Sequence, residues 1–121
     1  MKKLAVCLLT ALLFTACSAG IVLPDAEDVC RITVTGNGVQ TEIEDESTIR
    51  ELLRELRRAK DTGSDSMRDR PAEEGILQVD FTFRQGGTGT LFLREESDRV
   101  ILEQPFQRIY ETGKNVLDFL E

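Results

Sequence analysis

The sequence predicts an α+β protein whose mainly antiparallel sheet, an N-terminal hairpin plus a three-strand meander, is covered on one face by a helix. Apolar and polar residues alternate in short runs between residues 29 and 103, which is typical of half-buried strands. Between Asp45 and Lys60 the apolar residues instead recur at helical spacing. Apolar residues after Pro105 predict a short C-terminal helix, so the expected order is two strands, helix, three strands and helix.

The N-terminal hairpin is predicted over residues 29–35 and 39–43. Every second residue from Cys30 to Val34 is apolar, so these side chains should face the core. The intervening Gly36-Asn37-Gly38 can adopt the positive φ angles of a tight hairpin turn. The place of this hairpin within the sheet stays open.

The helix is predicted from an apolar stripe at positions i, i+3, i+4 and i+7, with one further member a turn later. Its members are Ile49, Leu52, Leu53, Leu56 and Ala59. Thr48 and Glu51 have the spacing of a capping box, and Asp45 is an alternative N-cap. Because this is the longest apolar stripe in the chain, we expect the helix to cover the sheet.

The meander follows an exposed connection over residues 61–75. Its three strands, with turn sequences between them, are predicted over residues 76–84, 90–94 and 99–103. Apolar residues at Ile109, Val116, Leu117 and Leu120 then predict the short closing helix. An edge strand over residues 116–120 is the alternative.

Composition limits the functions that the chain can have. Its 121 residues are enough for one modest core. The balance of 15 Lys and Arg against 22 Asp and Glu gives a net charge of −7, which argues against nucleic acid as a partner. The absence of His excludes catalysis and metal binding by imidazole.

The first residues predict export and a lipid anchor. Lys2 and Lys3 precede an apolar run over residues 4–14, which is the pattern of a signal peptide. As a helix this run is too short for a hydrocarbon core of about 30 Å. The segment Phe14-Thr15-Ala16-Cys17 resembles the lipobox of bacterial lipoproteins, which implies cleavage before Cys17 and lipid on its thiol. An ordinary secreted protein is the alternative.

This assignment divides the chain into a signal peptide (residues 1–16), a lipidated tether (17–28) and a single domain (29–121). Two or more acyl chains hold a protein stably on a bilayer, so we expect the extracytoplasmic face of the cell membrane. Cys7 leaves with the signal and Cys17 takes lipid. Cys30 therefore has no partner for a disulfide.

Three short motifs resemble known sites, and each has a plainer structural interpretation. Asp61-Thr62-Gly63 matches the tripeptide of aspartic proteases, which need a second carboxylate in a buried cleft. Asp61, Asp65 and Asp69 lack the remaining ligands of a calcium loop. Gly86-Gly87-Thr88-Gly89 lacks the Lys of a phosphate-binding loop and is typical of a hairpin turn. We therefore predict no catalytic residue, no metal site and no cofactor.

The most distinctive stretch covers residues 103–110. Glu103, Gln104, Phe106 and Tyr110 are predicted to form a contact patch for a ligand or a protein at one end of the sheet. In the structural alternative, Pro105 ends a strand because it has no N–H, and the aromatic side chains anchor the turn to the core.

A wider pattern includes Thr62, Ser66-Met67, Asp69, Pro71, the Gly86-Gly87 turn, Glu103-Gln104-Pro105-Phe106 and Ile109-Tyr110. In these residues the chain resembles a family of uncharacterised small lipoprotein domains of Gram-positive bacteria. Members of that family tend to read Glu-Gln-Pro-Tyr, two residues, then Ile-Tyr, and Phe106 stands here in place of the first Tyr. The resemblance implies an extracytoplasmic location and no known activity.

We expect a non-enzymatic, lipid-anchored domain that binds an envelope protein or a small ligand near the membrane. Two other classes stay open. One is an enzyme acting on envelope sugars through paired carboxylates, Glu103 with Asp80 or Glu95. The other is an inhibitor or immunity-type lipoprotein that protects its own cell surface.

Overall fold

A computed structural model describes residues 21–67 and 75–120. The predicted signal peptide, Cys17 and the first part of the tether lie outside the described residues. The elements, in chain order, are η1 (Ala26–Asp28), β1 (Val29–Gly36), β2 (Val39–Ile43), α2 (Glu46–Arg57), β3 (Lys60–Asp65), β4 (Leu77–Phe83), β5 (Thr88–Glu96), β6 (Arg99–Glu103), β7 (Arg108–Gly113) and η2 (Lys114–Phe119). No helix in these ranges is long and apolar enough to cross a membrane.

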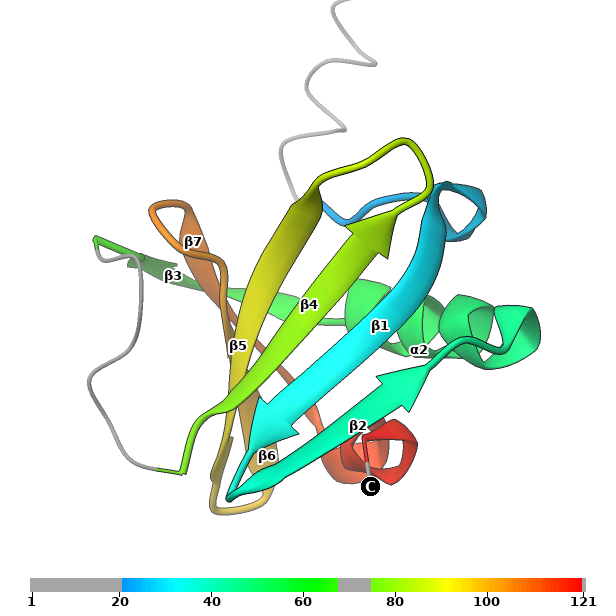
Figure 1. The fold of residues 1–121 in the computed structure, drawn as a ribbon. Helices are drawn as coiled ribbons and strands as arrows, with labels where there is room; N and C mark the ends of the chain where they lie inside the picture. Colours follow the sequence, from blue (N-terminus) through cyan, green and yellow to red (C-terminus); the bar gives the residue numbers. More distant parts are fainter. Residues whose placement is uncertain (1–20, 68–74, 121) are drawn as a thin grey trace, which may run out of the picture.

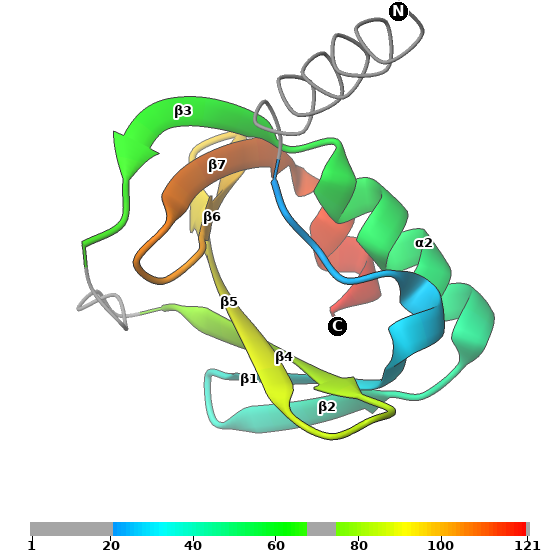
Figure 2. The same cartoon turned by 90° about the horizontal axis from the view of Figure 1, so that it is seen from above.

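The seven strands form one antiparallel sheet in the order β2-β1-β4-β5-β6-β7-β3. The sheet curls strongly, and α2 and η2 lie on its concave side (Figures 1 and 2). The N-terminal hairpin joins the meander through β1, which pairs with β4. The strand that follows α2 in the chain, β3, crosses to the opposite edge and pairs with β7.

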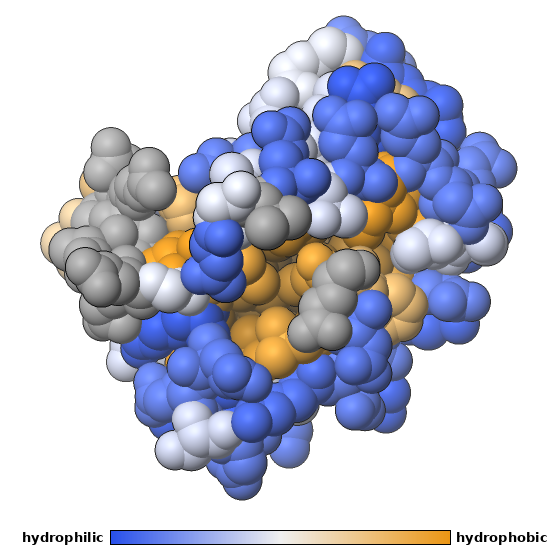
Figure 3. Space-filling view, turned by 60° about the horizontal axis from the view of Figure 1, so that its bottom comes forward, coloured by the Kyte–Doolittle hydropathy of each residue, from blue (hydrophilic) through white to orange (hydrophobic). Residues whose placement is uncertain are grey.

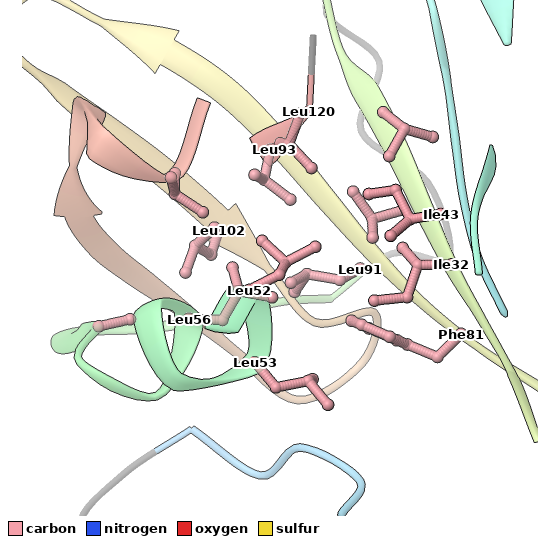
Figure 4. Packing of buried hydrophobic residues seen from close by; sticks show 14 of the residues in the cluster. Ile32, Ile43, Leu52, Leu53, Leu56, Phe81, Leu91, Leu93, Leu102 and Leu120 are labelled. Carbon is pink, nitrogen blue, oxygen red and sulfur yellow. The ribbon is translucent and has the colours of Figure 1, made fainter. Parts of the chain in front are cut away.

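The core fills the space between α2 and the concave side of the sheet. Ile49, Leu52, Leu53 and Leu56 of α2 are all buried, as the apolar stripe predicts. Figure 4 shows Leu52 of α2 beside Leu91 of the sheet, and both belong to the same buried cluster. Burial of one such side chain contributes about 1.5–3 kcal/mol, so the stripe fixes the helix on the sheet.

The helix begins at the alternative N-cap. Asp45 Oδ2 accepts hydrogen bonds from the backbone N of Thr48 at 3.0 Å, from Thr48 Oγ1 at 2.8 Å and from Ser47 Oγ at 2.6 Å. The bond from Thr48 N satisfies one of the free N–H groups of the first turn. The capping box predicted for Thr48 and Glu51 is therefore wrong.

The sheet predicted from the sequence, a hairpin plus a three-strand meander, was wrong. The structure has one sheet of seven strands. The sequence predicts a helix end and an exposed connection over residues 60–65, but these residues form the edge strand β3. All six of its residues are exposed, and a bulge between Asp61 and Ser64 interrupts its pairing with β7. A strand with no buried face has no apolar alternation, so its sequence does not indicate a strand.

The predicted C-terminal helix was also wrong over its first half. After the turn at residues 104–107 the chain returns as β7, with Tyr110 opposite Leu102 of β6. The helix that follows is the short 3-10 helix η2, and the alternative edge strand over residues 116–120 is not formed. The apolar spacing that predicted one helix thus comes from a strand joined to a single 3-10 segment.

A bulge in β1 changes which side chain faces the core. The register with β4 shifts between Val29 and Arg31, so Val29 is fully buried. Cys30 was predicted to face the core, but it is only partly buried, and its thiol donates to the carbonyl oxygen of Thr82 at 3.5 Å. Within the described residues Cys30 is a free cysteine.

The segment over residues 21–24, which we call the strap, is held against the domain. Ile21 and Leu23 are partly buried against the core. Arg57 Nη2 donates to the carbonyl oxygen of Pro24 at 2.8 Å. Figure 2 shows the strap crossing one end of the curled sheet on its way to η1. The part of the predicted tether from residue 21 onward is therefore packed on the domain.

Candidate functional site

The four residues of the predicted contact patch do not form one patch. Leu102 and Tyr110 are both in the core on the concave side. Glu103 follows Leu102 in β6, so it faces the convex side. Gln104 and Phe106 lie in the turn that joins β6 to β7, where Gln107 N donates to Gln104 O at 3.0 Å. The four residues are therefore divided between the concave side (Tyr110), the convex side (Glu103) and the turn (Gln104 and Phe106).

Glu103 is buried on the convex side with a hydroxyl partner. Ser66 Oγ donates to Glu103 Oε2 at 2.9 Å, and the two residues are only 3% and 4% exposed. Asp80 accepts hydrogen bonds from Thr90 Oγ1 at 2.6 Å and from Gln78 Nε2 at 3.0 Å. Each carboxylate thus has its own polar partner, as buried charge requires.

The carboxylates of the enzyme hypothesis do not share a cleft that the structure describes. Glu103 lines a small hollow with Phe92, Arg94 and Ile101, and neither Asp80 nor Glu95 lines it. Glu95 forms an ion pair with Lys114 at 3.3 Å. A glycosidase needs two carboxyls facing one space across the sugar, and this arrangement does not supply it.

The clearest candidate for a binding site is a groove beside the strap, with a volume of about 340 Å³. Most of its lining is apolar, and two glutamines from the β6–β7 turn, Gln104 and Gln107, add polar atoms. The lining residues are Val22, Leu23, Pro24, Phe81, Phe83, Gly89, Thr90, Leu91, Gln104 and Gln107.

Gln104 is the polar residue that defines this groove. Its side chain is buried, with 7% of the residue exposed. Nε2 donates to the carbonyl oxygen of Val22 at 2.7 Å, which ties the turn to the strap. Oε1 is buried and accepts no hydrogen bond from the described residues. A buried acceptor without a donor costs about 1–3 kcal/mol, so this oxygen favours any ligand that brings an N–H or O–H group.

The rest of the groove offers apolar contact. The Thr90 hydroxyl is already engaged with Asp80. A Cβ atom at Gly89 would lie 3.2 Å from Cζ of Phe83, so glycine keeps this wall open. No ionisable side chain lines the groove within the described residues. The groove walls can therefore bind an apolar group, and the amide groups among them can orient it.

A second hollow, of about 260 Å³, lies at the opposite end of the curled sheet. Its lining includes Val34, Leu77, Leu117 and Leu120. Figure 3, in which this end comes forward, shows apolar side chains gathered in a depression among hydrophilic ones. No unpartnered buried polar atom from the described residues lines it. It therefore lacks the feature that would orient a ligand.

The three short motifs have structural roles in the described residues. Asp61 lies on the edge strand β3, where the Gly63 backbone N–H and then Arg108 hold the pKa of its carboxyl below the ordinary value of 3.8. Arg108 also pairs with Asp65 at 2.9 Å, while Asp69 lies outside the described residues. The Gly86-Gly87 segment is a hairpin turn between β4 and β5, as predicted. No group of potential metal ligands occurs in residues 21–67 and 75–120.

Comparison with known proteins adds a family. A model for DUF5301, a domain of unknown function, matches residues 18–111. The chain belongs to this family. An NMR structure of a protein from Ruminococcus gnavus is 31% identical, with a TM-score of 0.70 over 83% of this chain and 98% of that chain. No match was found among curated proteins. Membership of the DUF5301 family agrees with the expected uncharacterised family and assigns no activity.

In this DUF5301 domain, most of the groove was not predicted from sequence. Phe81, Phe83 and Leu91 belong to strands whose alternation indicates only a core face. The strap has no sustained period, so its sequence predicts a tether. Gln104 was singled out, but no sequence signal reveals that one of its side-chain atoms lacks a partner.

Proposed function

We propose that the protein is a lipid-anchored, non-enzymatic binding domain on the extracytoplasmic face of the cell membrane. The leader and the lipobox-like segment ending at Cys17 support the anchor. The region that matches the family begins at residue 18, directly after that cysteine. A resemblance to small lipoproteins of Gram-positive bacteria points to the same location.

The ligand that the groove fits best is an apolar group with one N–H or O–H donor. The observation that supports this proposal is the buried Oε1 of Gln104, which has no donor in the described residues. A donor group of the ligand would remove the free-energy cost of leaving that oxygen without a hydrogen bond, and the groove walls would exclude water. Either a small ligand or an aromatic side chain of an envelope protein has this chemistry.

Binding without catalysis agrees with the lining of the groove. General acid–base chemistry needs a titratable group within reach of the substrate. The groove offers a backbone, apolar side chains, hydroxyl and amide groups. These groups position a ligand and do not transfer its protons.

The groove is tested with indole, an apolar ring with one N–H, against 1-methylindole, which lacks that donor. Titration of the processed, detergent-solubilised protein by NMR should show saturable shifts at Gly89 and at the Gln104 side-chain amide. We expect indole to bind about three- to tenfold more tightly than 1-methylindole, the effect of one buried hydrogen bond. In Gln104→Leu this preference should disappear.

Equal affinities of the two indoles, or shifts confined to another surface, would contradict the proposed ligand class. Cross-linking in membranes distinguishes the two ligand sources. A protein captured by the wild type and lost in Gln104→Leu indicates an aromatic side chain of a partner. Indole binding without such capture indicates a small ligand.

The anchor is tested separately by intact-mass measurement of the protein from its native membrane. Cleavage before Cys17 with added acyl mass is expected. An uncut leader with a bare Cys17 thiol would overturn the anchor and leave the groove experiment unaffected.

A further inference from the structure

We propose that one end of the domain lies against the lipid bilayer and inserts Val22, Met67 and Phe106 into its interfacial region. We call these three residues the apolar end. The proposal rests on the lipid anchor of the proposed function and adds the orientation of the domain on the membrane.

The first observation is exposure. Val22, Met67 and Phe106 are the large hydrophobic residues that the described ranges leave exposed, at 67%, 83% and 67%. Single exposed apolar residues are normal on protein surfaces, whereas a group of them marks an interaction site. The location of these three residues therefore decides whether they mark an interaction site.

Each of the three residues lies in the β6–β7 turn or in a segment hydrogen-bonded to it. Phe106 lies within the turn, between Gln104 and Gln107. Val22 is joined to it because its carbonyl oxygen accepts from Gln104 Nε2 at 2.7 Å. Met67 follows Ser66, whose backbone N donates to the carbonyl oxygen of Gln107 at 3.3 Å. In Figure 1 this turn, the end of β3 and the point where the chain enters the domain lie along the same upper edge.

The backbone of the turn directs an aromatic side chain into solvent. Phe106 has a φ angle of 58°, in the left-handed region that a bulky residue rarely adopts. Such a conformation is costly and is retained where the surroundings or the function require it. Aromatic rings at a membrane surface gain free energy from burial among headgroups and acyl chains.

The short stretch of chain between Cys17 and the domain favours the membrane as the surface that the apolar end contacts. Val22 follows Cys17 by five positions, a distance of at most about 18 Å when the chain is fully extended. Acyl chains on Cys17 would therefore hold the apolar end beside the leaflet. The β1–β2 and β5–β6 turns, which lie at the opposite end of the molecule in Figure 1, would face away from it.

The charges beside the apolar end are partly compensated. Arg108 pairs with Asp61 at 2.6 Å and with Asp65 at 2.9 Å, next to the turn. One guanidinium thus offsets part of the charge of the two carboxylates close to Phe106. This pairing lowers the repulsion that a strongly acidic chain would meet at an anionic leaflet.

Tryptophan fluorescence tests the orientation, because the chain has no Trp of its own. The lipidated variants Phe106→Trp and Met67→Trp are placed in vesicles of three parts phosphatidylcholine to one part phosphatidylglycerol, with or without acyl-brominated lipid. Gln40→Trp, at an exposed position of β2 near the opposite end, is the matched control. We expect blue-shifted emission and at least about twofold quenching for the first two variants, and neither effect for the control.

Vesicle flotation separates this inference from the anchor. If the variants float with the vesicles but neither Phe106→Trp nor Met67→Trp is quenched, the docking is overturned and the anchor stands. The apolar end would then be free for a protein partner. If the protein does not float and retains its leader, the anchor and the docking both fail. Equal quenching of all three variants would also overturn the docking, because it shows no preferred orientation.

Discussion

Gln104 and Val22 are joined by a 2.7 Å hydrogen bond from Nε2 to the carbonyl oxygen, although 82 positions separate them in the chain. The bond fastens the strap to the β6–β7 turn. It also leaves Oε1 of the same amide as the unpartnered acceptor of the groove. One side chain therefore closes the N-terminal segment over the domain and carries the buried acceptor on which the proposed ligand class rests.

Replacing Gln104 should release the strap. Gln104→Leu removes a hydrogen bond that contributes about 0.5–1.5 kcal/mol net. We expect faster hydrogen–deuterium exchange over residues 21–24. Gln107→Leu changes another groove-lining side chain without touching this bond, so it should leave exchange in the strap unchanged. Unaltered exchange in Gln104→Leu would show that apolar packing alone holds the strap.

A larger residue at Gly36 should destabilise the protein, for a reason other than its φ angle. A Cβ atom there would lie 2.5 Å from Leu77 Cδ2 and 3.0 Å from the carbonyl oxygen of Ile76. Gly36→Ala should therefore destabilise the protein by about 1–3 kcal/mol in urea unfolding. Gly113→Ala is the control, because its Cβ would meet nothing within 4 Å. Equal stability of the two variants would contradict the close approach of β1 and β4.

Stability should fall on acidification through the N-cap of α2. Hydrogen bonds from Ser47 and then Thr48 hold the pKa of Asp45 below its ordinary value of 3.8. A lowered folded-state pKa gives stability that is present above pH 3.8 and is lost as the pH falls through the folded-state value. Asp45→Asn keeps an acceptor that does not titrate. Its Tm should lie a few degrees below the wild type at neutral pH, and the two should converge in acid. A gap that widens in acid would contradict this assignment.

The Tyr110 hydroxyl should lose its proton at a higher pH than an ordinary tyrosine does. It is the one tyrosine of the chain, so the ultraviolet absorbance of tyrosinate reports it alone. Burial, and then the charge of Asp61, raise its pKa above 10.0, while Arg108 opposes them. Asp61→Asn should lower the midpoint, and the exposed Asp98→Asn should leave it unchanged. A wild-type midpoint at or below 10.0 would show that the ring is not held in the core.

The sequence determined the elements that have one buried and one exposed face. The stripe from Ile49 to Leu56 became α2, and the alternating runs became β1 with β2 and β4 to β6. Such elements place their apolar residues at a regular period, because one face must leave water. The leader and the lipobox-like segment at Cys17 are also local patterns, and the anchor derived from them stays a prediction.

Only the tertiary structure decided the two further strands, the strap and the groove. β3 has no buried face and is held by pairing with β7, for example Lys60 with Glu111. The strap is held by Gln104 and Arg57, both far from it in the chain. Long-range hydrogen bonds of this kind leave no period in the sequence, since each depends on where the curled sheet brings distant backbone together. The unpartnered oxygen of Gln104 exists for the same reason, because only the folded chain buries it.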